Sequence, residues 1–173
     1  NSIQALRYYL FHQSGDQPQI PWQHGDAGDS PCWFNCEANN NLKENIEQNQ
    51  DVVIIIPCRD GEETSFVEND PYLSQWIPLD ESGVPRNVLS AMRAKGLEFD
   101  RVALYGFGNQ APEDFLPNPK EKNTEERTPE WILPREYFIN RLYVAASRGK
   151  KQLFVIDSAK GYERLWGVFE EET

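Results

Sequence analysis

The most regular feature of the sequence is a set of short, continuous apolar runs. Residues 51–57 (DVVIIIP) form a β-branched run that is followed by a turn signal, Arg-Asp-Gly, at 59–61. A run without polar alternation predicts a strand buried on both faces, as in parallel sheets that are covered by helices. Similar runs predict strands near 86–91, at 101–106 and at 152–157.

Apolar residues at helical spacing predict helices around these strands. The expected helices span residues 3–12, 41–49, 135–147 and 159–169; the apolar spacing supports the first and third, and 41–49 is a short polar segment. The third has the clearest pattern, and we expect it to start directly after Pro134, because proline fits the first turn of a helix.

Three stretches lack such a pattern. Residues 14–40 are rich in Gly, Pro, Asp and Asn and predict irregular structure with short strands at most. Residues 60–84 predict polar turns, with Trp76 and Ile77 packing inward. Residues 108–133 combine Pro, Glu, Asn and Lys and predict a flexible insert.

The order of these elements predicts the fold class. Buried strands that alternate with helices indicate a single α/β domain over residues 1–173, with a mainly parallel sheet flanked by helices. In such sheets ligands bind beyond the carboxyl ends of the strands. No apolar run is long enough to cross a membrane and no secretion signal is visible, so we expect a cytoplasmic protein.

The charge distribution bears on which partners are possible. A net charge of −11 argues at first against nucleic acid. However, residues 1–85 carry 14 acidic and three basic side chains, whereas residues 86–173 carry 14 of each. Residues 135–164 carry seven basic and three acidic side chains, so a polyanion can approach the C-terminal half.

The cysteines suggest no disulfide framework. Cys32, Cys36 and Cys58 are an odd set, and without a secretion signal they fit reduced thiols. A zinc site formed by Cys32 and Cys36 with His12 and His24 is conceivable, but the spacings match no common zinc motif. We therefore expect no metal site.

The first segment with chemical potential is SAMRAKGLEFDRV, residues 90–102. Gly96 permits a backbone conformation or a close approach that other residues block. Lys95 supplies a mobile cation suited to phosphate, and Glu98 is an acceptor suited to a ribose hydroxyl. From spacing alone, a tight turn with a surface ion pair between Lys95 and Glu98 explains the same residues more simply.

The second segment is RLYVAASRGKK, residues 141–151. Arg148 lies at the end of the expected helix and precedes Gly149. This arrangement is also typical of an ordinary helix terminus with a cation that matches the helix dipole. The functional interpretation is that Arg148 reaches a nucleotide phosphate and stabilises charge during phosphoryl transfer.

Together these segments resemble two motifs of UvrD/Rep-like superfamily 1 helicases. AKGLEF (94–99) looks like motif V and LYVAASR (142–148) looks like motif VI, in the family's order and separation. The resemblance covers residues 86–158. It implies a RecA-like fold, specifically the second motor domain (2A), and ATP-dependent DNA helicase activity in the full-length protein.

The resemblance also implies roles for individual residues. Arg148 matches the arginine finger that reaches the γ-phosphate, Glu98 matches the acid on the ribose, and Lys95 and Gly96 match the turn that lines the nucleotide cleft. Two further positions, Ser90 and Met92, stand where the family has the Thr and His that touch the nucleic-acid strand.

The chain departs from the family at two places. Methionine at residue 92 cannot donate a hydrogen bond or carry charge, unlike the family's histidine at this position. Tyr137 and Phe138 replace the acidic pair that begins motif VI. These differences indicate an outlying branch of the family.

The sequence contains no Gly-x-x-x-x-Gly-Lys-[Ser/Thr] phosphate loop. We therefore expect ATP with Mg²⁺ to be bound mainly by an N-terminal RecA-like domain of the same protein, and this segment alone to be inactive. The expected partner is nucleic acid, with single-stranded DNA favoured over RNA. The alternatives are a catalytically inactive helicase-like binding module, and a motor that acts on RNA or is coupled to a nuclease. Trp22, Trp33 and Phe34 offer bases a stacking surface, but their acidic surroundings favour core or partner packing.

Overall fold

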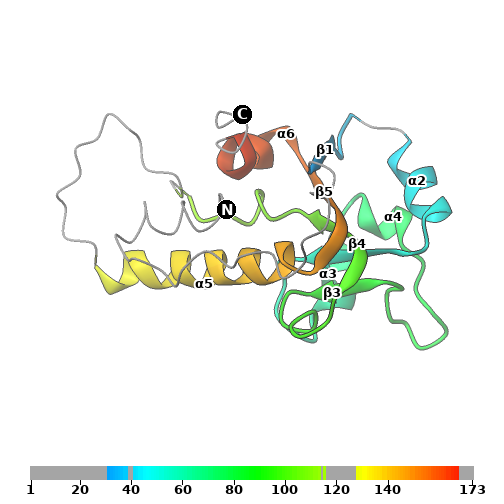
Figure 1. The fold of residues 1–173 in the computed structure, drawn as a ribbon, viewed down its shortest axis with the longest axis horizontal. Helices are drawn as coiled ribbons and strands as arrows, with labels where there is room; N and C mark the ends of the chain where they lie inside the picture. Colours follow the sequence, from blue (N-terminus) through cyan, green and yellow to red (C-terminus); the bar gives the residue numbers. More distant parts are fainter. Residues whose placement is uncertain (1–30, 39–40, 114, 116–127, 168–173) are drawn as a thin grey trace.

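The fold is built on one parallel sheet. A computed structural model describes residues 31–38, 41–113, 115 and 128–167. All five strands run parallel, in the order β1-β5-β4-β2-β3 (Figure 1). They are β1 (Cys32–Asn35), β2 (Val52–Ile56), β3 (Val88–Ser90), β4 (Phe99–Tyr105) and β5 (Gly149–Asp157).

The apolar runs in the sequence form the centre of this sheet. The run at 51–57 becomes β2, in which Ile54, Ile55 and Ile56 are each at most 1% exposed. β2 pairs with β3 on one side and with β4 on the other. Its side chains point alternately into two cores, one on each face of the sheet, and helices contribute to both cores. The expected strands therefore exist, and the prediction of a helix-flanked parallel sheet is confirmed.

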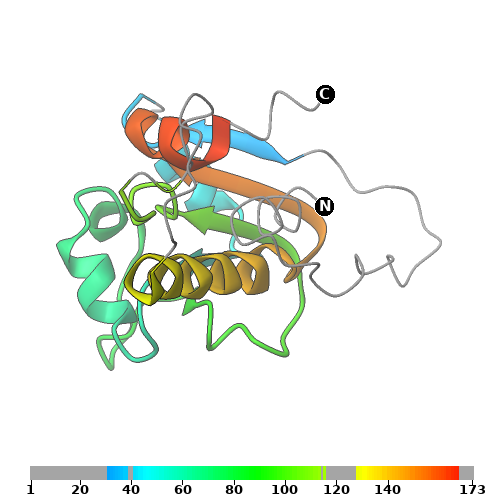
Figure 2. The ribbon, with the colours of Figure 1, turned by 90° about the vertical axis from the view of Figure 1, so that its left-hand side faces the viewer.

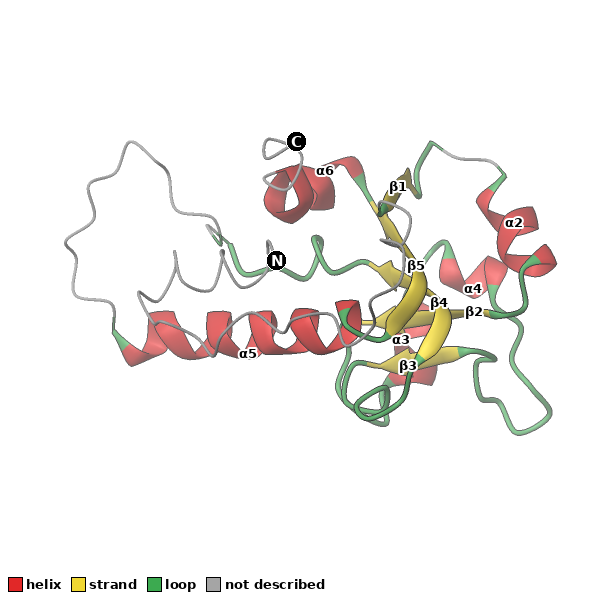
Figure 3. Ribbon diagram, viewed as in Figure 1, coloured by secondary structure: helices red, strands yellow, loops and turns green. Residues whose placement is uncertain are grey.

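Helices cover both faces of the sheet, as Figure 3 shows by colour. On one face lie α2 (Leu42–Gln48), α3 (Glu63–Asn69) and α4 (Leu73–Trp76). On the other lie α5 (Pro129–Ala146) and the π-helix η1 (Tyr162–Trp166), which follows the short α6 (Ala159–Gly161). Figure 2 shows β1, β5 and β4 side by side with α5 below them. No helix in these described ranges has the length and apolarity needed to cross a membrane.

Helix α5 begins earlier than the sequence pattern indicates. It starts at Pro129, and Pro134 lies inside it, so the predicted start after Pro134 is wrong. A proline in a helix interior removes one backbone hydrogen bond. Packing compensates: the Arg135 side chain donates to the carbonyls of Trp131 (3.0 Å) and Glu113 (2.9 Å), and its guanidinium lies 4.1 Å from the Trp131 ring centroid.

The expected insert at 108–133 is likewise ordered at both of its ends. Residues 129–133 are helical, and Phe115 is 2% exposed with its ring 5.0 Å from that of Phe138. Residues 114 and 116–127, the middle of the insert, lie outside the described residues.

Residues 60–84 contain two helices, α3 and α4, where only turns were expected. Tertiary contacts stabilise these short helices. The Asp70 carboxylate accepts hydrogen bonds from the backbone N–H of Tyr72 (2.9 Å) and Leu73 (2.8 Å) and from the Tyr105 hydroxyl (2.7 Å). Burial and this carboxylate raise the pKa of Tyr105 far above its ordinary value. Trp76 and Ile77 are buried, as predicted.

The two ends of the described chain meet at one edge of the sheet. β1 lies within the stretch predicted to be irregular and pairs with β5. Trp33 packs on Tyr162, with ring centroids 4.3 Å apart, and Phe34 packs on Phe154. These contacts favour the packing role expected for the two aromatic residues. The predicted helix 3–12 and Trp22 lie outside the described residues, as does the end of the predicted helix 159–169.

A buried carboxylate closes the carboxyl end of β5. Asp157 is 1% exposed and accepts hydrogen bonds from the backbone N–H of Gly108 and Ser158 and from Trp166 Nε1. Burial raises its pKa, although these hydrogen bonds oppose the rise. A Cβ at Gly108 would overlap the backbone carbonyl of Gly161, so glycine is required here for space.

We expect Gly108→Ala to destabilise the domain by about 2–4 kcal/mol, because rigid backbone atoms would have to move. The measurement is the urea unfolding midpoint. Gly167→Ala is the matched control: a Cβ there meets nothing closer than 3.6 Å, and its φ is −57°. Equal midpoints for the two variants would contradict this account of the packing.

Candidate functional site

Arg148 lies directly after α5 and is held in a fixed orientation. Its Nε donates to the Val144 carbonyl (3.0 Å), its Nη1 to the Leu97 carbonyl (3.1 Å) and its Nη2 to Ser147 Oγ (2.9 Å). A guanidinium has five N–H donors, so one donor on each Nη remains for another acceptor. The end of α5 thus presents a positioned cation beside the segment that precedes β4.

Glu98 lies on that segment, next to Leu97. Its Oε2 is 2.9 Å from Lys150 Nζ, and both side chains are more than half exposed. The hydrogen bond from Lys150 and the Lys150 charge hold the pKa of the Glu98 carboxyl below its usual range, with a smaller contribution from Arg148. Because Phe99 N donates to the Arg148 carbonyl at 2.9 Å, the carboxylate and both cations share one corner of the domain.

Lys95 and Gly96 form the turn that leads to Glu98. Gly96 has a φ of +83°, which side chains rarely adopt, while a Cβ there would meet nothing within 4 Å. Glycine is therefore needed for its conformation and not for a close approach. The simple alternative of a Lys95–Glu98 ion pair is not what forms, because Glu98 pairs with Lys150.

Glu98 and Arg148 lie at the amino ends of the strands, and Lys95 and Gly96 lie in the turn that leads there. Glu98 precedes β4 and Arg148 precedes β5, and the two strands start side by side with Phe99 opposite Gly149. The two charged side chains therefore lie at the edge opposite to the carboxyl ends, beyond which ligands bind in sheets of this kind. In a parallel sheet, residues that enter neighbouring strands meet at the amino edge.

Ser90 lies at the opposite edge. Ser90 ends β3 and pairs with Ile56 of β2. Measured along the strands, this level of the sheet lies about seven residues, or about 20 Å, from Glu98. Ser90 is fully buried, and its Oγ accepts a hydrogen bond from Arg93 N (3.3 Å), whereas Met92 is 49% exposed. Ser90 thus lies at the carboxyl edge and Glu98 with Arg148 at the amino edge. Met92 and Lys95 belong to the turn between them, where Lys95 N donates to the Met92 carbonyl at 3.2 Å.

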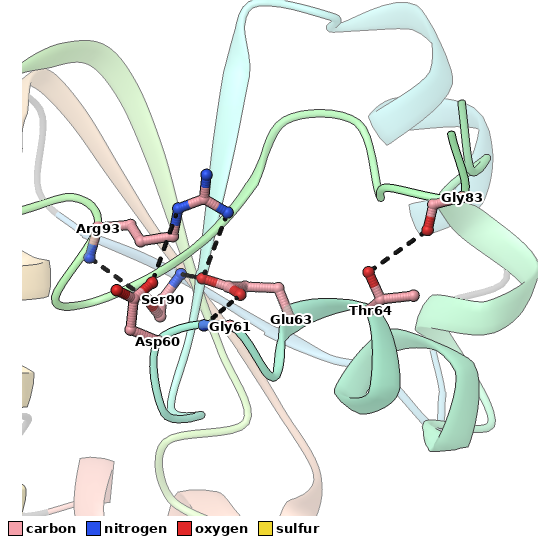
Figure 4. Close-up of polar contacts among 7 residues, drawn as sticks. All are labelled: Asp60, Gly61, Glu63, Thr64, Gly83, Ser90 and Arg93. Atoms are coloured by element: carbon pink, nitrogen blue, oxygen red, sulfur yellow. Dashed lines mark hydrogen bonds and ion pairs between the residues drawn. The ribbon is translucent and has the colours of Figure 1, made fainter. Parts of the chain in front are cut away.

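Sequence reasoning missed Glu63, which organises the carboxyl edge (Figure 4). Its carboxylate is 3% exposed and accepts from Gly61 N (2.9 Å) and Ser90 N (3.3 Å), while Arg93 Nη1 lies 3.8 Å away. Burial alone would raise the pKa of Glu63, but hydrogen bonds from its own backbone N–H and from Ser90, with the Arg93 charge, leave it lowered. The available signal was an acidic Asp-Gly-Glu-Glu segment directly after a buried strand.

An open crevice of about 440 Å³ lies near this cluster, beyond the carboxyl ends of β2 and β4. From β2 the chain continues to β3 on one side, and from β4 it continues to β5 on the other, so this is a switch point of the sheet. Its lining is Cys58, Glu62, Ser65, Phe66, Asn69, Asp70, Pro71 and Gln110.

The cysteines do not assemble a metal centre in the part of the chain that the structure describes. That part contains no group of three His, Cys, Asp or Glu side chains able to hold a metal ion. Cys36 and Cys58 are buried, and burial raises the pKa of both thiols to about 12, so they are protonated at neutral pH. His12 and His24 lie outside the described residues.

Comparison with known proteins adds no relative. The chain matches no protein-family model. It likewise matches no curated protein.

We expect Glu63→Gln to destabilise the domain by about 1–3 kcal/mol at neutral pH, because buried donors lose a charged acceptor. The folded-state pKa lies below the ordinary value of 4.5, so the carboxylate's contribution is full above that value and is lost as pH falls through the folded pKa. Urea midpoints between pH 7 and about pH 3 should therefore converge for wild type and variant at low pH. The control is Glu62→Gln, an exposed neighbour; a gap that persists in acid would refute the carboxylate's role.

Proposed function

We propose that this chain is the second, C-terminal RecA-like motor domain of an ATP-driven UvrD/Rep-like superfamily 1 helicase or translocase acting on nucleic acid. The observation that carries the proposal is the shared corner of Arg148 and Glu98. A guanidinium with two spare donors and an exposed carboxylate lie side by side at the amino edge of the sheet. A triphosphate and its ribose present groups of complementary charge and hydrogen-bonding character.

The proposed roles follow from this geometry. Arg148 stabilises negative charge that develops on the γ-phosphate, and Glu98 accepts a hydrogen bond from the ribose once nucleotide competes with Lys150. Gly96 sets the turn that brings Glu98 there. ATP with Mg²⁺ is held mainly by an N-terminal RecA-like domain of the same protein. The nucleotide cleft lies between the two domains, and one domain alone cannot position all the reacting groups.

A second candidate is a catalytically inactive helicase-like module. It is favoured by the carboxyl edge, where Ser90 is buried and Met92 offers no hydrogen-bond donor. The sequence upstream of this segment in the full-length protein discriminates between the two. A phosphate loop followed by an Asp-Glu pair supports the motor, and an upstream domain without them supports the module.

In the full-length protein, Arg148→Ala should lower the nucleic-acid-stimulated kcat for ATP hydrolysis by about 10³-fold, as for other arginine fingers. Arg148→Lys should remain impaired, because lysine lacks the planar fork. The matched control is Arg101→Ala, whose guanidinium contacts Asp51 and Asn49 instead. Wild-type turnover in Arg148→Ala would refute the assignment.

The chain on its own should show no ATP hydrolysis above a buffer blank in a phosphate-release assay, with or without single-stranded DNA. The physical reason is that the chain contains no phosphate loop to hold the β- and γ-phosphates. ATP hydrolysis by the isolated chain that persists in Arg148→Ala would contradict the proposal that an N-terminal domain holds ATP and that this domain supplies Arg148.

A further inference from the structure

Two arginines flank the loop that follows β2 at the carboxyl edge. From α5, Arg141 Nη2 donates to the Cys58 carbonyl at 3.0 Å. From the turn after β3, Arg93 lies 3.7 Å from Asp60 and 3.8 Å from Glu63, and Figure 4 shows its guanidinium above these two carboxylates. One loop therefore positions two cations that come from distant parts of the sequence.

An exposed aromatic ring lies beside the first of these arginines. Tyr137 is 52% exposed, one helical turn before Arg141 on α5, and the Arg141 guanidinium lies 5.0 Å from the Tyr137 ring centroid. Because Arg141 is anchored on Cys58, the stacked pair is positioned before any ligand arrives. Binding of a ligand on the ring therefore costs little conformational entropy of these two side chains.

We propose that Tyr137 and Arg141 form a base-stacking platform for single-stranded nucleic acid, with Arg93, which contacts the same loop after β2, available for the backbone phosphates. This proposal rests on the proposed motor function and names its strand contact. It moves that contact away from Ser90, which is fully buried, to the exposed Tyr137 and the half-buried Arg141.

The chemistry of the pair favours this ligand. Arg141 uses one of its donors on Cys58, so further N–H groups remain for phosphate or base acceptors. Stacking on an aromatic ring is tolerant of sequence and works without a dense positive surface, which suits a chain of net charge −11. A duplex hides the faces of its bases, so a single strand is the form that can stack here.

The test uses the full-length protein and a fluorescently labelled single-stranded oligothymidylate, with binding followed by anisotropy at fixed salt. Tyr137→Ala should weaken binding about tenfold, since stacking contributes about 1–3 kcal/mol per base. Tyr137→Phe keeps the ring and should bind as wild type does. Arg141→Ala should also weaken binding, whereas Arg101→Ala, at the amino edge, should not.

The salt dependence separates stacking on Tyr137 from phosphate contact at Arg93. Tyr137→Ala should leave the slope of log K against log salt unchanged, because it removes no phosphate contact, while Arg93→Ala should reduce the slope by about one. Circular dichroism melting confirms that each variant is folded.

The outcomes distinguish failure of the stacking platform from failure of the proposed motor function. If the wild-type protein binds the strand and hydrolyses ATP, but Tyr137→Ala and Arg141→Ala bind equally well, the platform is refuted and the motor stands. If the wild-type protein neither binds nor hydrolyses, the proposed function and the platform fall together.

Discussion

The arrangement of this domain depends on one constraint of a parallel sheet: each connection must return the chain from the carboxyl edge to the amino edge. Two connections do so on the same face. Residues 91–98 lead into β4, and α5 leads into β5. Since β4 and β5 are neighbours, both connections end at one corner, where the Arg148 carbonyl accepts from Phe99 N and the Arg148 guanidinium donates to the Leu97 carbonyl. The juxtaposition of Glu98 with Arg148 follows from strand order.

The central strands were predictable from sequence because burial on both faces imposes an unbroken apolar pattern, as at Ile54–Ile56. The short helices α3 and α4 were not, because they depend on Asp70, whose carboxylate binds Tyr105 on a distant strand. The start of α5 was missed for the same reason, since the buried Arg135 of this helix binds the carbonyl of Glu113, which is 22 residues away in the sequence. The local sequence pattern therefore does not predict a helix whose stability depends on contacts with distant residues.

The candidate site shows the same division. Gly96 and Arg148 were identifiable because a turn and a helix end constrain residue type locally. Their edge of the sheet was not, because the sequence alone does not reveal which end of a strand faces a ligand. Glu63 was missed because its partners Ser90 and Arg93 lie 27 or more residues away. Its buried carboxylate has meaning only after β2 and β3 have paired.

Two elements, α5 and the 91–98 connection, join the two edges of the sheet. Arg141 and Arg148 are seven residues apart, and the α5 helix between them is a rigid segment of about 10 Å. The 91–98 connection is fixed at one end by Ser90 and Glu63 and at the other by Arg148. A shift of α5 along its axis would therefore strain the bond to Cys58 and the bond to Leu97 together. If nucleotide binds at the corner of Arg148 and Glu98 as proposed, this linkage would let its binding alter the position of Tyr137 without any change in the sheet itself.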